Sequence, residues 1–293
     1  MARPPSTDDN SENYAESDGS NSPHRLAFDR FGKGEPMVLL HGQGFSRRSW
    51  DPIIDALSDD HDVIAVDLPG HGDSPRQPKG RGSAPHDLAV AVTELLDDLG
   101  LDRPHVVGHS SGGWIALELG RLHRASTITA LAPAGLWRSA PPHMRLAMRQ
   151  FRINAKLVRL LAPDAPESRL VRGVSMLPAS GRPFSLPYEP VRTMVHDLAA
   201  APGFGESLHA LESRRFSDGA AITAPVTIAF GSRDMVMLPG IARQRDQLPE
   251  HTRWVTMPKC GHLQVFDDPD AVVELLLAAT DPDRRAQLGA PLR

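Results

Sequence analysis

Apolar residues along the chain gather into short, mostly apolar runs, and segments with apolar residues at helical spacing lie between them. A continuous apolar run such as 36–40 is typical of a strand buried on both faces of a sheet. The runs lie at 36–40, 63–66, 106–107, 128–131, 226–230 and 253–257. The segments with helical spacing lie at 46–60, 85–99, 239–248 and 269–279. This alternation predicts an α/β fold with a doubly wound, mostly parallel sheet, to which 26–31 adds an alternating, exposed-edge strand.

The alternation is interrupted between 134 and 222. This stretch is rich in Pro, Arg and Met, and it contains no apolar run that resembles a buried strand. Helical spacing is present near 143–161 and 190–213. We therefore expect a helical cap at 134–222, inserted between a first part of the core at 25–133 and a second part at 223–293.

The N-terminal residues 1–24 differ in composition from the rest. They are acidic and polar and have almost no apolar side chains, so they cannot repay the entropy lost on ordering. They also lack the apolar segment of a signal peptide. We expect a disordered acidic tail.

Overall composition limits the class of protein. A hydrophobic fraction of 40% and a charged fraction of 23% are ordinary for a soluble globular chain. The net charge of −4 argues against a nucleic-acid partner or an anionic membrane surface. No apolar run approaches the roughly 18 residues of a membrane span. The single cysteine, Cys260, rules out an internal disulfide and is compatible with a reducing compartment, so we expect a cytoplasmic protein.

A glycine-flanked serine lies where one predicted strand ends and a helix begins. The strand at 106–107 leads into Gly108-His109-Ser110-Ser111-Gly112, and an amphipathic segment follows directly. This is the setting of a nucleophile elbow, whose turn is so sharp that both flanking positions must be glycine. The helix would direct its N-terminal N–H groups towards whatever Ser110 attacks.

An acid and a base follow two later strands. Asp234 comes after the strand at 226–230, and His262 comes after the strand at 253–257. Imidazole can take the serine proton and return it to a leaving group, and a carboxylate can hold the ring in the required tautomer. The order Ser110, Asp234, His262 is that of the α/β-hydrolase triad. We expect the N–H groups of Gln43 and Ser111 to bind the oxyanion.

Several short segments together resemble the cap-bearing α/β-hydrolase family, which also includes epoxide hydrolases and haloalkane dehalogenases. The matching segments are 41–44 (HGQG), 67–74 (DLPGHGDS), 108–113 (GHSSGG), 231–234 (GSRD) and 261–262 (GH). Epoxide hydrolases and dehalogenases of this family have Asp at the nucleophile position, so Ser110 favours acyl chemistry. Some relatives take the acid from the strand before the cap, but residues 128–163 contain no Asp or Glu, which leaves Asp234.

Other polar residues near these segments have simpler explanations. We expect structural roles for His41, His71 and His109, a loop-capping role for Asp67 and a packing role for Cys260. In the cap region we expect an apolar substrate pocket. Its predicted lining is Trp137, Met144, Met148, Phe151 and Met235, and Met237 is a further candidate. No metal-ligand spacing, phosphate loop or dinucleotide fingerprint is present, so no metal or cofactor is expected.

These observations lead to a first hypothesis of a cofactor-free serine hydrolase. It would cleave carboxylic esters, thioesters or lactones of small to medium apolar compounds through an acyl-enzyme on Ser110. The same triad could instead hydrolyse a C–C bond, transfer an acyl group or carry out perhydrolysis. A third alternative is a ligand-binding or signalling protein with a slow triad. The sequence names neither the substrate nor the oligomeric state.

Overall fold

The computed structural model describes residues 25–162 and 164–287. The predicted acidic tail lies outside the described residues. Seven strands form one sheet in the order β1-β3-β2-β4-β5-β6-β7. β1 pairs antiparallel with β3, and every other neighbouring pair is parallel. The strands are β1 (Phe28–Phe31), β2 (Glu35–Leu40), β3 (His61–Val66), β4 (His105–His109), β5 (Thr127–Leu131), β6 (Val226–Gly231) and β7 (Arg253–Met257).

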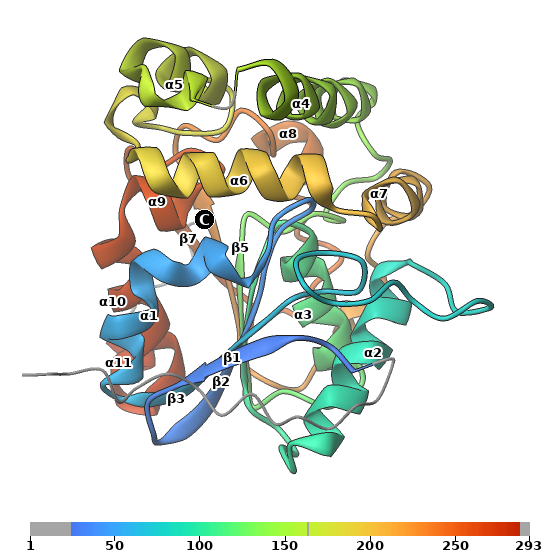
Figure 1. Ribbon diagram of the computed structural model, residues 1–293. Coiled ribbons are helices and arrows are strands. Elements are labelled where there is room, and N and C mark those ends of the chain that lie inside the picture. Colours follow the sequence, from blue (N-terminus) through green and yellow to red (C-terminus); the bar gives the residue numbers. More distant parts are fainter. Residues whose placement is uncertain (1–24, 163, 288–293) are drawn as a thin grey trace, which may run out of the picture.

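Helices cover both faces of this sheet (Figure 1). α2 (Pro85–Asp98) and α3 (Ser111–Arg121) lie on one face, and α1 (Asp51–Ser58) and α10 (Pro269–Thr280) lie on the other. Alternate residues of β2 serve the two layers, because successive strand side chains point to opposite faces. Val38 and Leu40 belong to the core under α2 and α3, whereas Met37 and Leu39 belong to the core under α1 and α10. Four short elements also lie outside the inserted helices: α8 (Pro239–Ala242), α9 (Gln264–Asp267), α11 (Pro282–Gln287) and the 3-10 turn η1 (Arg47–Trp50).

The interruption predicted from sequence is a group of helices between β5 and β6. Figure 1 shows it above the carboxyl ends of the strands. It consists of α4 (Pro142–Leu161), α5 (Arg169–Met176), α6 (Tyr188–Ala200) and α7 (Phe204–Glu212), with 3-10 turns at η2 (Ala165–Glu167), η3 (Pro183–Ser185) and η4 (Gly219–Ala221). α4 and α6 contact one another along their length. The fold class and the helical insertion are therefore as predicted.

Three details of the sequence prediction were wrong or incomplete. The helix expected at 239–248 ends at Ala242, and the N–H of Gln244 donates to the carbonyl of Leu136 in the segment after β5. The single helical stretch expected at 190–213 is two helices, separated by the segment 201–203, in which Pro202 lacks an N–H. α5 was not predicted at all. In the first two cases a tertiary contact or a single proline outweighs the periodic pattern.

Among the described residues, no helix is both long enough and apolar enough to cross a membrane.

Candidate active site

Ser110 occupies a strained turn between β4 and α3. Its φ of 53° and ψ of −113° fall in a region that residues with a Cβ rarely adopt. The flanking glycines allow the close approach of neighbouring backbone. A Cβ on Gly108 would lie 2.1 Å from the carbonyl oxygen of Gly112, and one on Gly112 would lie 2.1 Å from that of Leu40. The elbow therefore forms for the steric reason inferred from the sequence.

Two backbone N–H groups beside Ser110 are candidates for binding an oxyanion. Ser111 is the first residue of α3, so its N–H has no acceptor within the helix. Gln43 follows β2 and lines the same cavity as Ser110. Its side-chain amide donates to the carbonyl of Phe204 (3.0 Å) and to the hydroxyl of Ser207 (2.8 Å), both on α7. The cap thus helps to fix the loop that carries the Gln43 N–H.

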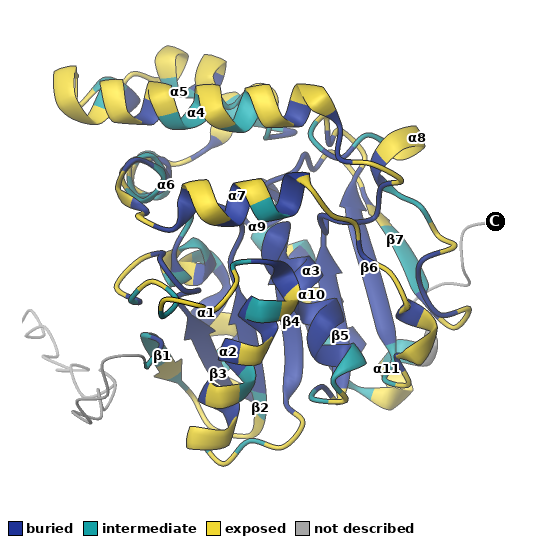
Figure 2. Cartoon of the chain, turned by 90° about the vertical axis from the view of Figure 1, so that its right-hand side faces the viewer, coloured by how far each residue is buried: buried dark blue, intermediate teal, exposed yellow. Residues whose placement is uncertain are grey.

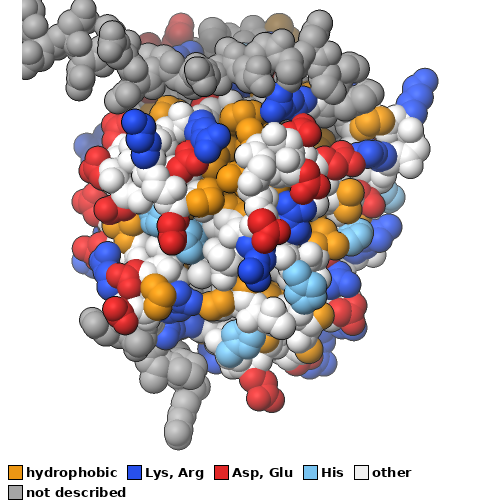
Figure 3. All heavy atoms as spheres, turned by 90° about the horizontal axis from the view of Figure 1, so that it is seen from below, with side chains coloured by type: hydrophobic (Ala, Val, Ile, Leu, Met, Phe, Trp, Pro, Cys, Tyr) orange, Lys and Arg blue, Asp and Glu red, His pale blue; other side chains and the backbone are white. Residues whose placement is uncertain are grey.

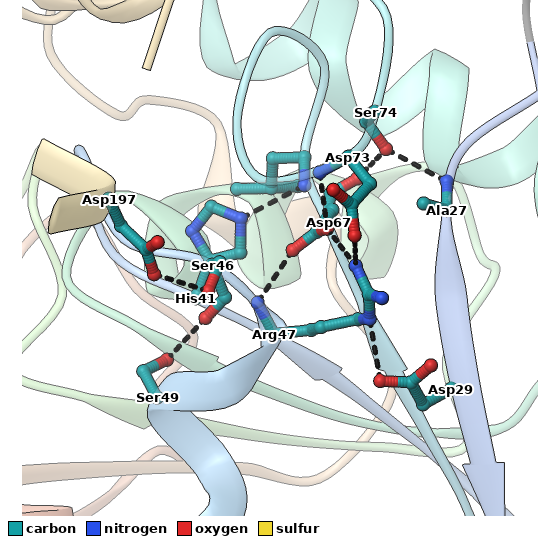
Figure 4. A network of polar contacts seen from close by, with 11 residues as sticks. Ala27, Asp29, His41, Ser46, Arg47, Ser49, Asp67, Asp73, Ser74 and Asp197 are labelled. Carbon is teal, nitrogen blue, oxygen red and sulfur yellow. Dashed lines mark hydrogen bonds and ion pairs between the residues drawn. The ribbon is translucent and has the colours of Figure 1, made fainter. Parts of the chain in front are cut away.

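A polar network fastens this loop to the loop after β3 (Figure 4). The buried carboxylate of Asp67 accepts hydrogen bonds from the N–H groups of Arg47 (2.7 Å) and Asp73 (2.8 Å) and pairs with the Arg47 guanidinium. The same guanidinium reaches Asp29 at 2.6 Å and the exposed Asp73 carboxylate at 3.0 Å. Asp67 therefore holds two loops together, in keeping with the structural role expected from its position.

A second contact joins the cap to the same loop. The hydroxyl of Ser46 donates to the carboxylate of Asp197 on α6 at 2.5 Å. Together with the Gln43 amide, this bond connects the loop after β2 to α6 and α7.

Asp234 and His262 meet at the ends of β6 and β7. His262 Nδ1 lies 3.2 Å from Asp234 Oδ2, and Asp234 Oδ1 accepts the N–H groups of Val236 and Met237 at 2.8 Å each. Burial alone would raise the pKa of Asp234. The charge and hydrogen bond of His262 and the two N–H donors outweigh it and lower that pKa below its ordinary value. The carboxylate is therefore ionised and orients the imidazole.

Ser110 and His262 line the same cavity, and so does His109, which directly precedes Ser110 in the chain. The ring centroids of His109 and His262 are 4.9 Å apart, and His109 Nε2 donates to the His262 carbonyl at 2.9 Å. Among the described residues, no hydrogen bond joins the Ser110 hydroxyl to the His262 ring. Catalytic hydrogen bonds of this kind are often long or poorly aligned before substrate binds.

The remaining histidines near the elbow are neutral and buried. Burial lowers the pKa of His41 to about 4 and the pKa values of His71 and His109 to about 3. His41 Nε2 accepts the N–H of Leu68 at 3.0 Å, so this ring supports the loop after β3. Burial also raises the pKa of Cys260 to about 11, which keeps this thiol protonated. None of these groups is suited to act as a base or nucleophile near neutral pH.

An apolar cavity of about 340 Å³ lies between Ser110 and the cap. All five residues expected in a pocket line it: Trp137, Met144, Met148, Phe151 and Met235. So does Met237. Other lining residues were not predicted from the sequence; they include Phe45, His143, Val195, Leu198, Leu208 and Leu263. Leu198 lies four residues after Met194, and this helical spacing could have indicated that the two share a face of α6.

Among residues 25–162 and 164–287, no group of three or more His, Cys, Asp or Glu is arranged to hold a metal ion.

Comparison with known proteins agrees with this architecture. Residues 37–275 match the model of the alpha/beta hydrolase family. The chain belongs to the alpha/beta hydrolase family. The match spans β2 to α10 and therefore includes the elbow, the cap and the Asp234–His262 pair.

Individual members of the alpha/beta hydrolase family that resemble the chain differ in their named reactions. The chain is 30% identical over 241 residues to "Putative carbamate hydrolase RutD" of Pseudomonas savastanoi pv. phaseolicola, covering 80% of this chain and 88% of the relative. It is 29% identical over 195 residues to epoxide hydrolase EphH of Mycobacterium tuberculosis, covering 64% and 91%. A solved thermophilic esterase from Thermogutta terrifontis has the same fold, with a TM-score of 0.65, 22% identity, and coverage of 90% and 94%.

Proposed function

We propose that the chain is a serine hydrolase that cleaves carboxylic esters of small to medium apolar compounds, with thioesters and lactones as chemically related substrates. The observation that carries the proposal is the position of Ser110. It stands on a strained elbow at the floor of an apolar cavity, which His262 also lines, and Asp234 orients His262.

In the proposed mechanism, the Ser110 Oγ attacks the substrate carbonyl carbon while His262 Nε2 takes the hydroxyl proton. The tetrahedral oxyanion accepts hydrogen bonds from the N–H groups of Gln43 and Ser111. Collapse breaks the bond to the leaving alcohol, which receives the proton from His262. Water, deprotonated by the same ring, then attacks the acyl-enzyme and releases the acid. Asp234 stabilises the imidazolium in both halves without taking its proton.

The identity of residue 110 separates this proposal from epoxide opening. A serine oxygen that opened an epoxide would form an ether, and water does not cleave an ether under the conditions that cleave an ester. A serine that attacks an acyl carbon forms an ester, which the His262–Asp234 pair can hydrolyse. The similarity to an epoxide hydrolase therefore supports the fold, and Ser110 supports acyl chemistry.

The cavity lining supports an apolar substrate. Among the described residues that line it, none is Asp, Glu, Lys or Arg, and six are methionines: Met144, Met148, Met176, Met194, Met235 and Met237. Methionine is flexible and fills irregular apolar space, so such a pocket accommodates several acyl or alcohol shapes. A charged substrate group within it would lose its hydration without gaining a partner.

The proposal is tested by replacing the nucleophile. Ser110→Ala should abolish hydrolysis of short p-nitrophenyl esters and labelling by a fluorophosphonate probe, because both require the Oγ nucleophile. Ser213→Ala is a matched control that removes an exposed hydroxyl at the end of α7. It should keep wild-type hydrolysis and labelling.

Two outcomes would contradict the assignment. Ester hydrolysis retained by Ser110→Ala would exclude Ser110 as the nucleophile. Product analysis with a diketone and with alternative acyl acceptors identifies the other reactions open to this triad. Faster turnover of the diketone than of any ester would replace ester hydrolysis with C–C bond hydrolysis.

A further inference from the structure

The outer face of the cap exposes an unusual number of large apolar side chains. Figure 2 shows α4 and α5 as the outermost layer of the molecule, with much of their surface exposed. On α4, Leu146, Leu160 and Leu161 are each more than 70% exposed. We call the following residues the outer apolar stripe: Leu146, Ile153, Leu157, Leu160 and Leu161 of α4, and Leu170, Val171, Val174 and Leu177 of α5 and its end. Elsewhere in the described chain, the exposed large apolar residues are Val90, Phe184, Met235 and Ile241.

The stripe is separate from the cavity. The opposite side of α4 carries Met144, Met148 and Phe151, which line the cavity above Ser110. α4 is therefore apolar on two faces, and only one of them has a partner within the described residues. A group of exposed large apolar side chains on one helix face, such as that of α4, marks an interaction site in many soluble proteins.

Basic side chains border the stripe. Between residues 142 and 178 the chain has seven Lys or Arg and only two acidic residues, Asp164 and Glu167, although the whole chain has a net charge of −4. The exposed basic residues of α4 are Arg145, Arg149, Lys156 and Arg159. Arg145 and Arg149 pair with the buried Glu212 of α7, at 3.9 Å and 3.2 Å. α4 itself contains no acidic residue, and Lys156 and Arg159 form no ion pair with the described residues. These two residues therefore leave positive charge without an acidic partner beside the stripe.

The opposite end of the molecule has a different surface. Figure 3 shows that end, where basic and acidic side chains are interspersed and the visible apolar patches are small. The visible part of this face therefore lacks the combination of an apolar stripe and unbalanced positive charge that the cap has.

We propose that the outer face of α4 and α5 docks on an anionic lipid surface. An amphipathic helix that lies in a membrane interface has an apolar face for the acyl boundary and Lys or Arg beside it for the headgroups. The outer apolar stripe would supply the first, and Lys156 and Arg159 the second. Docking in this orientation leaves the sheet in water and places the cap between the lipid and Ser110.

Charge complementarity distinguishes this occupant from a second copy of the chain. A symmetric dimer through the same face would bring the basic residues of one α4 close to those of the other, and such like-charge contacts oppose association. Lipid headgroups with negative charge instead attract them, and each basic residue near the surface contributes about 1 kcal/mol.

The test is co-sedimentation with vesicles of phosphatidylcholine alone and of equimolar phosphatidylcholine and phosphatidylglycerol. The wild type should bind the anionic vesicles, bind the neutral ones much less, and dissociate as salt is added. The double substitution Lys156→Gln and Arg159→Gln should weaken binding roughly 30-fold, from about 1 kcal/mol per charge. Leu157→Ser, Leu160→Ser and Leu161→Ser together should weaken it roughly tenfold or more.

The matched control variants replace exposed residues outside the cap. Lys33→Gln with Lys79→Gln removes the same charge from two exposed loops, and Val90→Ser removes an exposed apolar side chain from α2. Both should bind like the wild type, and so should Ser110→Ala, because docking does not require the proposed esterase activity. Thermal unfolding of each variant checks that the fold is retained.

Three results would overturn the proposal. One is a wild type that does not bind the anionic vesicles. Another is a Lys33/Lys79 control that loses as much binding as the Lys156/Arg159 variant. The third is a dimer, seen by analytical ultracentrifugation, that the leucine substitutions dissociate, since the stripe would then be an interface between copies of the chain.

Discussion

Asp234 shows how one side chain can serve the site without touching the cavity. Its carboxylate is fully buried, and it contacts His262 and the N–H groups of Val236 and Met237. Its lowered pKa keeps it ionised at neutral pH, so its negative charge is always available to the imidazolium that the proposed reaction forms. At the residue scale, its part in catalysis is to position and stabilise the base.

Replacing the Asp234 carboxylate with an amide tests whether this residue positions His262 or contributes to substrate binding. Asp234→Asn should lower kcat by roughly 10³- to 10⁴-fold, because the amide neither fixes the tautomer nor balances the imidazolium. KM should change little, since Asp234 does not line the cavity. Steady-state kinetics with a p-nitrophenyl ester measures both, and Asp246→Asn, on an exposed carboxylate, is the control. A large rise in KM with unchanged kcat would contradict the positioning role.

At the scale of elements, the loops after β2 and β3 depend on each other. Asp67 is the common partner, through the Arg47 guanidinium and through the N–H groups of Arg47 and Asp73. The first of these loops also carries Gln43, the proposed oxyanion donor, and its side chain is bound to α7. Geometry at the nucleophile is therefore maintained by contacts that extend from the sheet edge to the cap.

Asp67 and Asp73 both pair with the Arg47 guanidinium, so their effects on stability can be compared at one site. Asp67 is fully buried, whereas the Asp73 side chain is 66% exposed. Asp67→Asn should lower the free energy of unfolding by about 1.5–3 kcal/mol, because it removes a buried, charged acceptor of several hydrogen bonds, while Asp29 and Asp73 still pair with Arg47. Asp73→Asn should lower it by less than about 1 kcal/mol. Urea denaturation measures both, and equal effects would show that burial does not set the strength of these pairs.

At the scale of the whole molecule, buried neutral histidines make stability depend on pH. The folded-state pKa values of His41, His71 and His109 are about 4, 3 and 3, below the ordinary 6.5. Between these values and 6.5 the unfolded chain binds protons that the folded chain does not. Stability is therefore full above about pH 6.5 and falls as the pH drops below it, by about 1.4 kcal/mol per pH unit for each ring.

Urea denaturation between about pH 7 and pH 5 should reveal this slope. His71→Gln should reduce the slope, since one ring that must stay neutral in the fold is gone. His251→Gln, at an exposed position, should leave it unchanged. Stability that rises on acidification through this range would show that these rings are protonated in the fold.

The sequence predicted those parts of the molecule in which local pattern and tertiary structure agree. The strands of the parallel sheet were evident because burial on both faces favours mostly apolar runs, as at 36–40 and 226–230. The elbow was evident because its turn requires glycine at 108 and 112. The candidate acid and base could be named because parallel strands bring their carboxyl ends to one edge.

The cap could be predicted only in outline. α5 was missed although Leu170, Val174 and Leu177 recur at helical spacing, and the only local signal for the break between α6 and α7 was Pro202. Cavity residues such as Leu198 and Leu208 resemble any buried leucine until α6 and α7 are placed over Ser110. The charge of the cap was also hidden, because the net charge of −4 averages a basic outer layer with an acidic remainder.

Because the backbone at Ser110 is strained, selection for the catalytic serine opposes selection for a more stable fold. A φ of 53° in a residue with a Cβ costs about 1–3 kcal/mol, which the rest of the fold must offset. Alanine retains the Cβ and hence the strain, so Ser110→Ala removes the hydroxyl without relaxing the turn. Glycine would relax it and remove the hydroxyl in one step. A lineage that no longer needed the reaction would thus gain stability by losing this serine, whereas a serine that persists there does so against a standing thermodynamic disadvantage.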